Sequence, residues 1–298
     1  MFLCYLGAFV LGTIIGSFLN VVIDRADTGE SIWKGRSHCP YCGKTLSWWE
    51  LIPILSFVFL RGRCSSCHHK LSWQYPLVEG GTGFIFAFLL RFLLRFPFLS
   101  SFPHWPFLEQ ILVATNVCLL FYWASVLIVL AVYDMKKYLI LNEVLLPAIG
   151  ITLIWKIGEG ILLRIPSLHL SFLSSLNHFL GSQLYLFGYY SYFASLFLGT
   201  AFFAGIISLL ALLTREKAMG WGDAILAFFL GMILGWPESL IALIIAFLSG
   251  GIVSLILIVL KKKTFHSYIP FAPFLAFSAL TVILFGDIII KAYLSLVQ

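Results

Sequence analysis

Eight long apolar segments constrain the fold of this chain more than any other feature of its sequence. They lie near residues 2–23, 77–98, 109–133, 138–163, 192–213, 218–236, 237–260 and 269–290. A helix needs about 20 apolar residues to cross the roughly 30 Å of bilayer hydrocarbon. Only 11% of the residues are charged and the mean hydropathy is +1.00, so lipid must solvate most of the surface. The sequence therefore predicts an all-α polytopic membrane protein with about eight transmembrane helices.

Three stretches need their own interpretation. Segment 2–23 lacks the basic start and small-residue cleavage site of a secretory signal, so we interpret it as a retained span. Residues 165–191 are only moderately apolar, which favours an interfacial helix or an ordered loop over another span. Trp236-Pro237-Glu238 is expected to form the tight turn between the sixth and seventh spans.

The distribution of basic residues predicts the orientation in the membrane. Of the 19 lysines and arginines, 14 lie in four loops, at 25–76, 134–137, 214–217 and 261–263. With eight spans these loops share one side, and the positive-inside rule makes that side cytoplasmic. Both termini are then expected outside. Basic residues gathered in loops fit membrane orientation better than nucleic-acid binding, so no nucleic-acid partner is expected.

Four of the six cysteines form two C-x-x-C pairs in loop 25–76. The pairs are Cys39–Cys42 and Cys64–Cys67, and 21 residues separate them. Two such turns can direct four thiolates at one tetrahedral ion, and a filled shell of four thiolates is typical of structural zinc. Disulfides are the alternative, which a cytoplasmic location disfavours. We therefore predict a cytoplasmic zinc-knuckle loop with these four cysteines as the metal ligands.

Carboxylates at membrane depth are costly and mark candidate functional positions. The predicted topology puts Asp134 at the end of the third span and Asp223 at the start of the sixth, both at the cytoplasmic face. When two carboxylates converge, the ionised one can activate water while the protonated one polarises a carbonyl group. Asp24, Glu79 and Glu143 also lie at cytoplasmic helix ends, so the topology alone does not select the pair.

The residues before Asp223 carry a resemblance to a known family. Gly220-Trp221-Gly222-Asp223 resembles the GxGD motif of the type IV prepilin peptidases, and its two glycines can let the backbone leave helical geometry. These enzymes are often bifunctional leader peptidase/N-methyltransferases. Further matches follow the family's order: Gly16–Ile23 with Arg25, the cysteine pairs, Tyr75–Glu79 (preceded by Gln74 instead of arginine) and Ile269–Leu275.

The resemblance implies roles for particular residues. Asp134 and Asp223 would be the catalytic aspartates of an intramembrane aspartyl peptidase, which cleaves a basic leader from type IV prepilins and pseudopilins. Its active site would lie at the cytoplasmic face of the bacterial inner membrane. S-adenosylmethionine would be the methyl donor for the new N-terminal amine, often that of phenylalanine. Asn20 and Glu79 are the candidate cofactor-binding residues for this step.

The resemblance also divides the chain into two parts. Residues 1–98 would hold the first two spans, the zinc-knuckle loop and the N-methyltransferase part, and residues 108–298 the six-span peptidase bundle. Three alternatives remain open: a peptidase with a purely structural zinc loop, an ion-coupled membrane transporter, and a nonenzymatic assembly factor. A transporter would need carboxylates near the membrane midplane and inverted repeats, and the sequence shows neither.

Overall fold

The computed structural model describes six stretches of the chain. They are residues 2–32, 34–94, 107–162, 189–216, 219–264 and 267–297. Within these stretches the β-structure is limited to two isolated bridges, and helices dominate. Contacts divide the chain into two compact units, one of Met1–Leu99 with Asn116–Val129 and one of Ser100–Thr115 with Leu130–Gln298.

Each of the eight apolar segments predicted from the sequence contains a helix. The helices are α1 (Phe2–Thr28), α3 (Gln74–Leu93), α4 (Phe107–Lys137), α5 (Asn142–Leu162), α7 (Tyr189–Thr214), α8 (Trp221–Leu234), α9 (Glu238–Val259) and α10 (Ala272–Val297). Among the described residues, six helices have the length and composition to cross a membrane, namely α1, α3, α4, α5, α7 and α9. The predicted all-α, multi-pass architecture is thus confirmed.

Helix α8 is shorter than the predicted sixth span. It has 14 residues, which at 1.5 Å per residue cover about 21 Å, less than the bilayer hydrocarbon. A tight turn joins α8 to α9 as predicted, but it covers residues 235–237, one residue earlier than Trp236–Glu238, because α9 begins at Glu238. Trp236 N–H donates to the carbonyl oxygen of Ser195 in α7 at 3.1 Å. The interfacial helix or loop expected at 165–191 lies outside the described residues, except for the start of α7.

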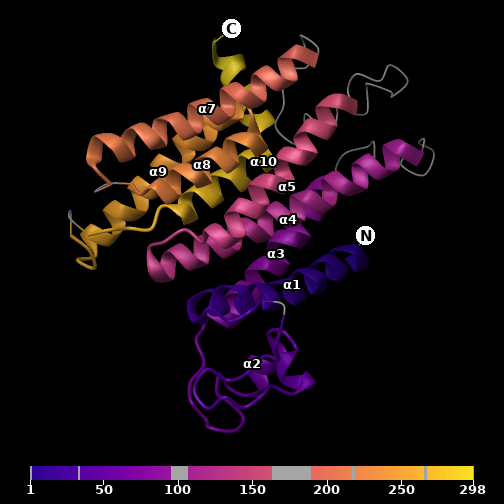
Figure 1. Cartoon of the computed structure of the whole chain (residues 1–298), viewed down its shortest axis with the longest axis vertical. Coiled ribbons are helices and arrows are strands. Elements are labelled where there is room, and N and C mark those ends of the chain that lie inside the picture. The colour runs from indigo at the N-terminus through magenta and orange to yellow at the C-terminus, as the bar shows by residue number, and fades with distance from the viewer. Residues whose placement is uncertain are drawn as a thin grey trace. The chain divides into compact units, whose positions relative to one another are not determined.

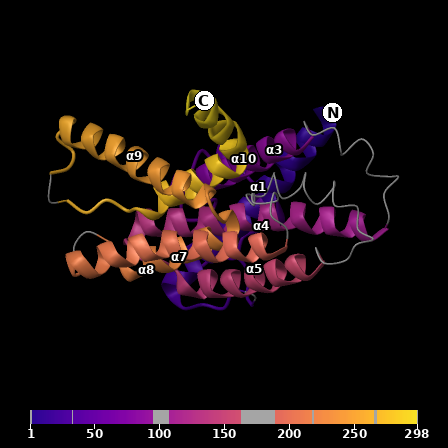
Figure 2. The same ribbon diagram turned by 90° about the horizontal axis from the view of Figure 1, so that it is seen from above.

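In the first unit, glycines allow α1 and α3 to pack closely. A Cβ atom added to Gly12 would lie 2.7 Å from the Cα atom of Gly83, and one added to Gly16 would lie 2.8 Å from the Cα atom of Glu79. The order of these pairs makes the two helices antiparallel, and they lie side by side in both views (Figures 1 and 2). Small residues spaced four apart permit this close approach between membrane helices.

The segment between α1 and α3 forms a lobe of loops with two short helices, η1 (Trp48–Leu51) and α2 (Leu55–Phe59) (Figure 1). Arg25, near the end of α1, organises the start of this lobe. Its Nη1 atom donates to the carbonyl oxygens of Ser31 and Lys34 at 2.6 and 2.9 Å. The side chain is buried, so these carbonyl groups replace the water that its charge would otherwise bind.

In the second unit, α8 lies among other helices and contacts α5, α7, α9 and α10 (Figure 1). Nine of its 14 residues are buried, and its closest approach is to α7, where a Cβ atom added to Gly231 would lie 2.6 Å from the Cα atom of Thr200. Helices α7 and α8 also lie side by side when the molecule is turned (Figure 2). Protein therefore covers a helix that is too short to satisfy the bilayer alone, and its N-terminus carries Asp223.

Candidate functional site

Asp134 lies in the last turn of α4 and is buried, with 5% of its surface exposed. Its Oδ2 atom accepts a 3.0 Å hydrogen bond from the N–H of Ala272, the first residue of α10. The first N–H groups of a helix have no partner within that helix, so they are available to a carboxylate. The N-terminus of α10 thus holds the Asp134 carboxylate in place.

Asp223 lies in the first turn of α8, where its Oδ2 atom accepts a 3.3 Å hydrogen bond from the N–H of Gly220. Its carboxylate is close enough to that of Asp134 for the two groups to interact electrostatically. The structure therefore brings together the two acids that the sequence placed on a shared face, although 88 intervening residues separate them.

A tight contact at Gly222 sets how α8 meets the segment that follows α4. A Cβ atom added to Gly222 would lie 2.8 Å from Cγ1 and 2.9 Å from Cβ of Ile140, whereas carbon atoms prefer about 3.5–4.0 Å. Gly220 leaves helical geometry, with φ −87° and ψ 160°, but these angles are open to any residue. Close packing at Gly222 is therefore what requires a glycine in this motif.

The N-terminus of α10 is a component of this site that sequence reasoning did not identify. Ile269–Leu275 was noted only as part of a resemblance, and its chemistry lies in a backbone N–H group, which any residue except proline carries. Pro273, in the first turn of α10, is a helix-start signal that could have indicated it. The segment before α10 also contacts the residue that follows α4, because Lys263 Nζ donates to the Tyr138 hydroxyl group at 3.4 Å.

The four predicted metal ligands form a second site in the first unit. The Sγ atoms of Cys39, Cys42, Cys64 and Cys67 all lie within 4.8 Å of one another. Cys39 is 3.9 Å from Cys67 and Cys42 is 4.0 Å from Cys64, so none of these thiols is in a disulfide, which needs about 2.05 Å. Four sulfur atoms at about 2.3 Å from a tetrahedral ion would be about 3.8 Å apart. The cluster therefore fits one metal ion.

The two knuckles repeat one backbone turn. In each, the residue after the second cysteine donates its N–H to the carbonyl oxygen of the first: Gly43 to Cys39 at 2.9 Å and His68 to Cys64 at 3.1 Å. Both donors have a left-handed backbone, with φ of 68° and 56°. Hydrogen bonds from the backbone N–H groups of Cys67 and Ser66 lower the pKa of the Cys64 thiol to about 6. Backbone N–H groups of the second knuckle therefore favour a thiolate at Cys64.

Glu50 joins the two knuckles. Its side chain is 2% exposed, and its carboxylate accepts hydrogen bonds from Lys44 Nζ at 3.1 Å, from Ser47 N–H at 2.7 Å and from the Ser65 hydroxyl group. Burial alone would raise the pKa of Glu50, but the hydrogen bonds from Ser47, Ser65 and Lys44 lower it to about 2. Sequence reasoning missed this residue, although Ser47-x-x-Glu50 has the spacing of a helix capping box.

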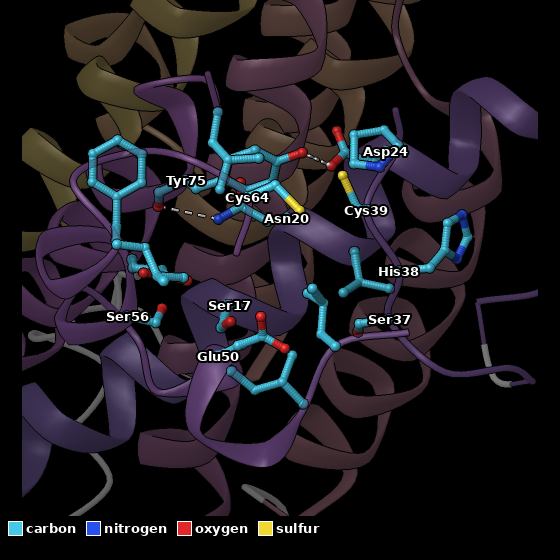
Figure 3. Close-up of a pocket in the computed structure, with 18 of the residues that line it drawn as sticks. Ser17, Asn20, Asp24, Ser37, His38, Cys39, Glu50, Ser56, Cys64 and Tyr75 are labelled. Atoms are coloured by element: carbon cyan, nitrogen blue, oxygen red, sulfur yellow. Dashed lines mark hydrogen bonds between the residues drawn. The ribbon is translucent and has the colours of Figure 1, made fainter. Parts of the chain in front are cut away.

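A cavity of about 210 Å³ lies beside the cysteine cluster in the first unit (Figure 3). Its walls come from α1, from the lobe and from the start of α3. Four carboxylates line it, those of Asp24, Glu30, Glu50 and Glu79. The one arginine in its wall, Arg25, directs its guanidinium at backbone carbonyl groups. The cavity therefore suits a ligand with a positive charge.

Asn20 and Glu79, the candidate cofactor-binding residues, both line this cavity. The Asn20 amide donates to the carbonyl oxygen of Tyr75 at 3.2 Å and accepts from Gln74 Nε2 at 3.1 Å. Glu79 is 7% exposed, and its Oε2 atom accepts from the N–H of Ile54 at 2.7 Å. Asn20 thus fixes one wall by joining α1 to α3, and Glu79 adds a carboxylate that also fixes the end of the lobe.

Both parts of the chain are similar to known proteins. A family model described as the bacterial peptidase A24 N-terminal domain matches residues 10–93, and one described as the type IV leader peptidase family matches residues 119–255. A prepilin leader peptidase/N-methyltransferase from Bacillus subtilis (strain 168) is 30% identical, with 97% of both chains covered. One from Aeromonas hydrophila is also 30% identical, covering 96% of this chain and 92% of that protein.

A more similar stretch is shared with a prepilin leader peptidase/N-methyltransferase from Myxococcus xanthus (strain DK1622). The two are 53% identical over 83 residues, which are 28% of this chain and 25% of that protein. No solved structure matches the chain.

Proposed function

Because this chain belongs to the type IV leader peptidase family, we propose that it cleaves the leader peptide of type IV prepilins and pseudopilins, with Asp134 and Asp223 as the catalytic pair. The observation that carries this proposal is the proximity of the two carboxylates, each held by a backbone N–H group at a helix N-terminus, α8 for Asp223 and α10 for Asp134. The family assignment favours this function over the ion-coupled transporter considered from the sequence.

The chemistry follows from sharing one proton between two neighbouring carboxylates. The ionised carboxylate removes a proton from water, and the water oxygen attacks the scissile carbonyl carbon. The protonated carboxylate donates its proton to the carbonyl oxygen, and a proton then returns to the leaving amine as the C–N bond breaks. Each aspartate accepts a backbone hydrogen bond that fixes its carboxylate, so the pair is positioned before substrate binds.

The peptidase proposal is tested by Asp134→Asn and Asp223→Asn in membranes that contain a prepilin. Each substitution keeps the size of the side chain but removes its charge, so we expect each to abolish leader cleavage. The double variant should be no worse than either single variant, because residues that act as a unit are not additive. Asp27→Asn, at an exposed position of α1, is the matched control. Normal prepilin processing by either single variant would contradict the aspartyl mechanism.

We place the catalytic pair at the cytoplasmic face of the bacterial inner membrane. The support is the clustering of basic residues in the loops that adjoin Asp134 and Asp223. Reporter fusions after Lys262 and after Gln298 should then give opposite signals, because the first lies inside and the second outside. Equal signals from the two fusions would contradict this orientation.

For the first unit we propose methyl transfer to the new N-terminal amine. Residues 1–98 would carry this activity and residues 108–298 the peptidase. S-adenosylmethionine, when bound, supplies an electrophilic methyl group on a positively charged sulfonium, and the acidic cavity with Asn20 and Glu79 in its wall suits that charge. Mass spectrometry of a mature pilin N-terminus tests this proposal directly, since it reports both the cleavage position and an added methyl group.

We assign zinc to the four cysteines as a structural ion. Four thiolates complete a tetrahedral shell and leave no open position for substrate, which is typical of structural rather than catalytic zinc. Zinc would hold the two knuckles together and so maintain the lobe that walls the cavity. Metal analysis of purified protein should find one zinc per chain, and metal-free protein with four reduced thiols would contradict the assignment.

A further inference from the structure

We propose that Asp24, together with Tyr75, forms the subsite that binds the N-terminal amine of the cleaved pilin. This inference rests on the proposed methyl transfer, because it assigns a place to the second substrate of that reaction. The Oδ2 atom of Asp24 accepts a 2.8 Å hydrogen bond from the Tyr75 hydroxyl group at the cavity wall (Figure 3). A carboxylate can accept several hydrogen bonds at once, so an amine N–H can join the phenol at Asp24.

Two other carboxylates of the cavity wall, Glu30 and Glu50, have basic side chains as partners. Glu50 binds Lys44, which neutralises it. Glu30 is 45% exposed and lies 3.9 Å from both Arg25 and His38, so it belongs to the rim. Asp24 and Glu79 are the other two acids in the cavity wall.

Asp24 and Glu79 lie at different levels of the α1–α3 pair. Glu79 is opposite Gly16 on α1, because a Cβ atom on Gly16 would lie 2.8 Å from the Cα atom of Glu79. Asp24 lies eight residues further along α1, a rise of about 12 Å along the helix axis. The two acids can therefore bind different charges, the peptide amine at Asp24 and the sulfonium group of the methyl donor at Glu79.

A bound amine at Asp24 is oriented for methyl transfer. A neutral amine can donate one N–H to the Asp24 carboxylate, which directs the nitrogen lone pair away from the carboxylate and into the cavity. The lone pair forms the new N–C bond to the methyl carbon while the C–S bond breaks and its electrons stay on sulfur. The ammonium product then releases one proton to water. In this step Asp24 binds and orients the amine.

A binding measurement without methyl donor tests the subsite in the full-length, detergent-solubilised protein. The probes are a peptide with the sequence of a mature pilin N-terminus, beginning with phenylalanine, and the same peptide with its amine acetylated. We expect the wild-type protein to bind the free-amine peptide about tenfold or more tightly than the acetylated one, as for a hydrogen bond to a charged group. Asp24→Asn should lose most of this preference.

Three variants make the test specific. Asp27→Asn, one turn further along α1 and outside the cavity wall, should keep the wild-type preference. Asp24→Glu retains the charge and should keep part of the preference. Tyr75→Phe removes the hydroxyl that holds the carboxylate and should reduce the preference. In steady-state methylation, Asp24→Asn should raise the KM for the free-amine peptide about tenfold, with the affinity for S-adenosylmethionine unchanged.

The possible failures are distinguishable. If Asp24→Asn, with wild-type metal content, keeps the full wild-type preference for the free amine, the subsite is wrong while methyl transfer itself stands. If the wild-type protein adds no methyl group to the pre-cut peptide and shows no preference, both the methyl-transfer proposal and this subsite fail.

Discussion

Replacing Gly222 by alanine should damage the peptidase site through one defined contact. The added Cβ atom would lie 2.8 and 2.9 Å from the Cγ1 and Cβ atoms of Ile140, so either residue must move by roughly 0.6 Å or more to reach ordinary carbon contact. Overpacking of this kind costs about 1–3 kcal/mol. Asp223 follows Gly222 directly, so the shift displaces its carboxylate from Asp134. A misplacement near 1 Å can slow a reaction about a hundredfold.

Gly220→Ala is the matched control, because no neighbouring atom lies closer than 3.9 Å to its added Cβ and its backbone angles suit any residue. We expect Gly222→Ala to lower the first-order rate of prepilin cleavage by roughly tenfold to a hundredfold, and Gly220→Ala to change it little. Combining Gly222→Ala with Ile140→Ala should recover part of the lost rate, because the second substitution removes Cγ1 of Ile140, the atom nearest the added Cβ. The effects of the two substitutions should therefore not be additive.

Two results would refute this reasoning about the motif. One is wild-type cleavage by Gly222→Ala, which would show that the contact with Ile140 does not set the position of Asp223. The other is equal damage from Gly220→Ala and Gly222→Ala, which would mean that backbone freedom, rather than close packing, explains both glycines. A thermal unfolding measurement on the same proteins separates loss of rate from loss of fold.

Three further outcomes are expected. Removing the metal with a chelator should expose the lobe to proteases and leave the helices of the second unit intact, as limited proteolysis would show. At pH values above 4.5, the ordinary pKa of a glutamate, the ionised Glu50 contributes its full stabilisation to the folded lobe. This contribution is lost as the pH falls toward about 2, the lowered pKa of Glu50 in the fold. Hydrogen exchange of metal-free protein should therefore show an acid-sensitive lobe between these pH values, and Glu50→Gln should lack that dependence. Gly16→Leu would overlap the Glu79 backbone, so it should separate α1 from α3 and abolish binding of S-adenosylmethionine in a calorimetric titration.

Sequence alone located the helices because each transmembrane helix satisfies its backbone hydrogen bonds within one segment. A long apolar run therefore predicts its own structure, as it does for α1, α4 and α9. The cysteine spacing likewise predicted the cysteine cluster, since each knuckle is a local turn and only the meeting of the two pairs is long-range. Charge counting placed Asp134 and Asp223 on one predicted membrane face, and the resemblance of Gly220–Asp223 to a family motif selected them from the other acids there.

Only the tertiary structure revealed what surrounds these residues. The N–H of Ala272 reaches Asp134 across 138 positions of sequence, and Tyr75 reaches Asp24 across 51. Ile140 meets Gly222 because α8 packs against the segment after α4. Apolar periodicity does not encode these contacts, because lipid solvates apolar side chains as well as a neighbouring helix does. Close packing and hydrogen bonds between helices, and not hydropathy, decide which helices meet in a membrane.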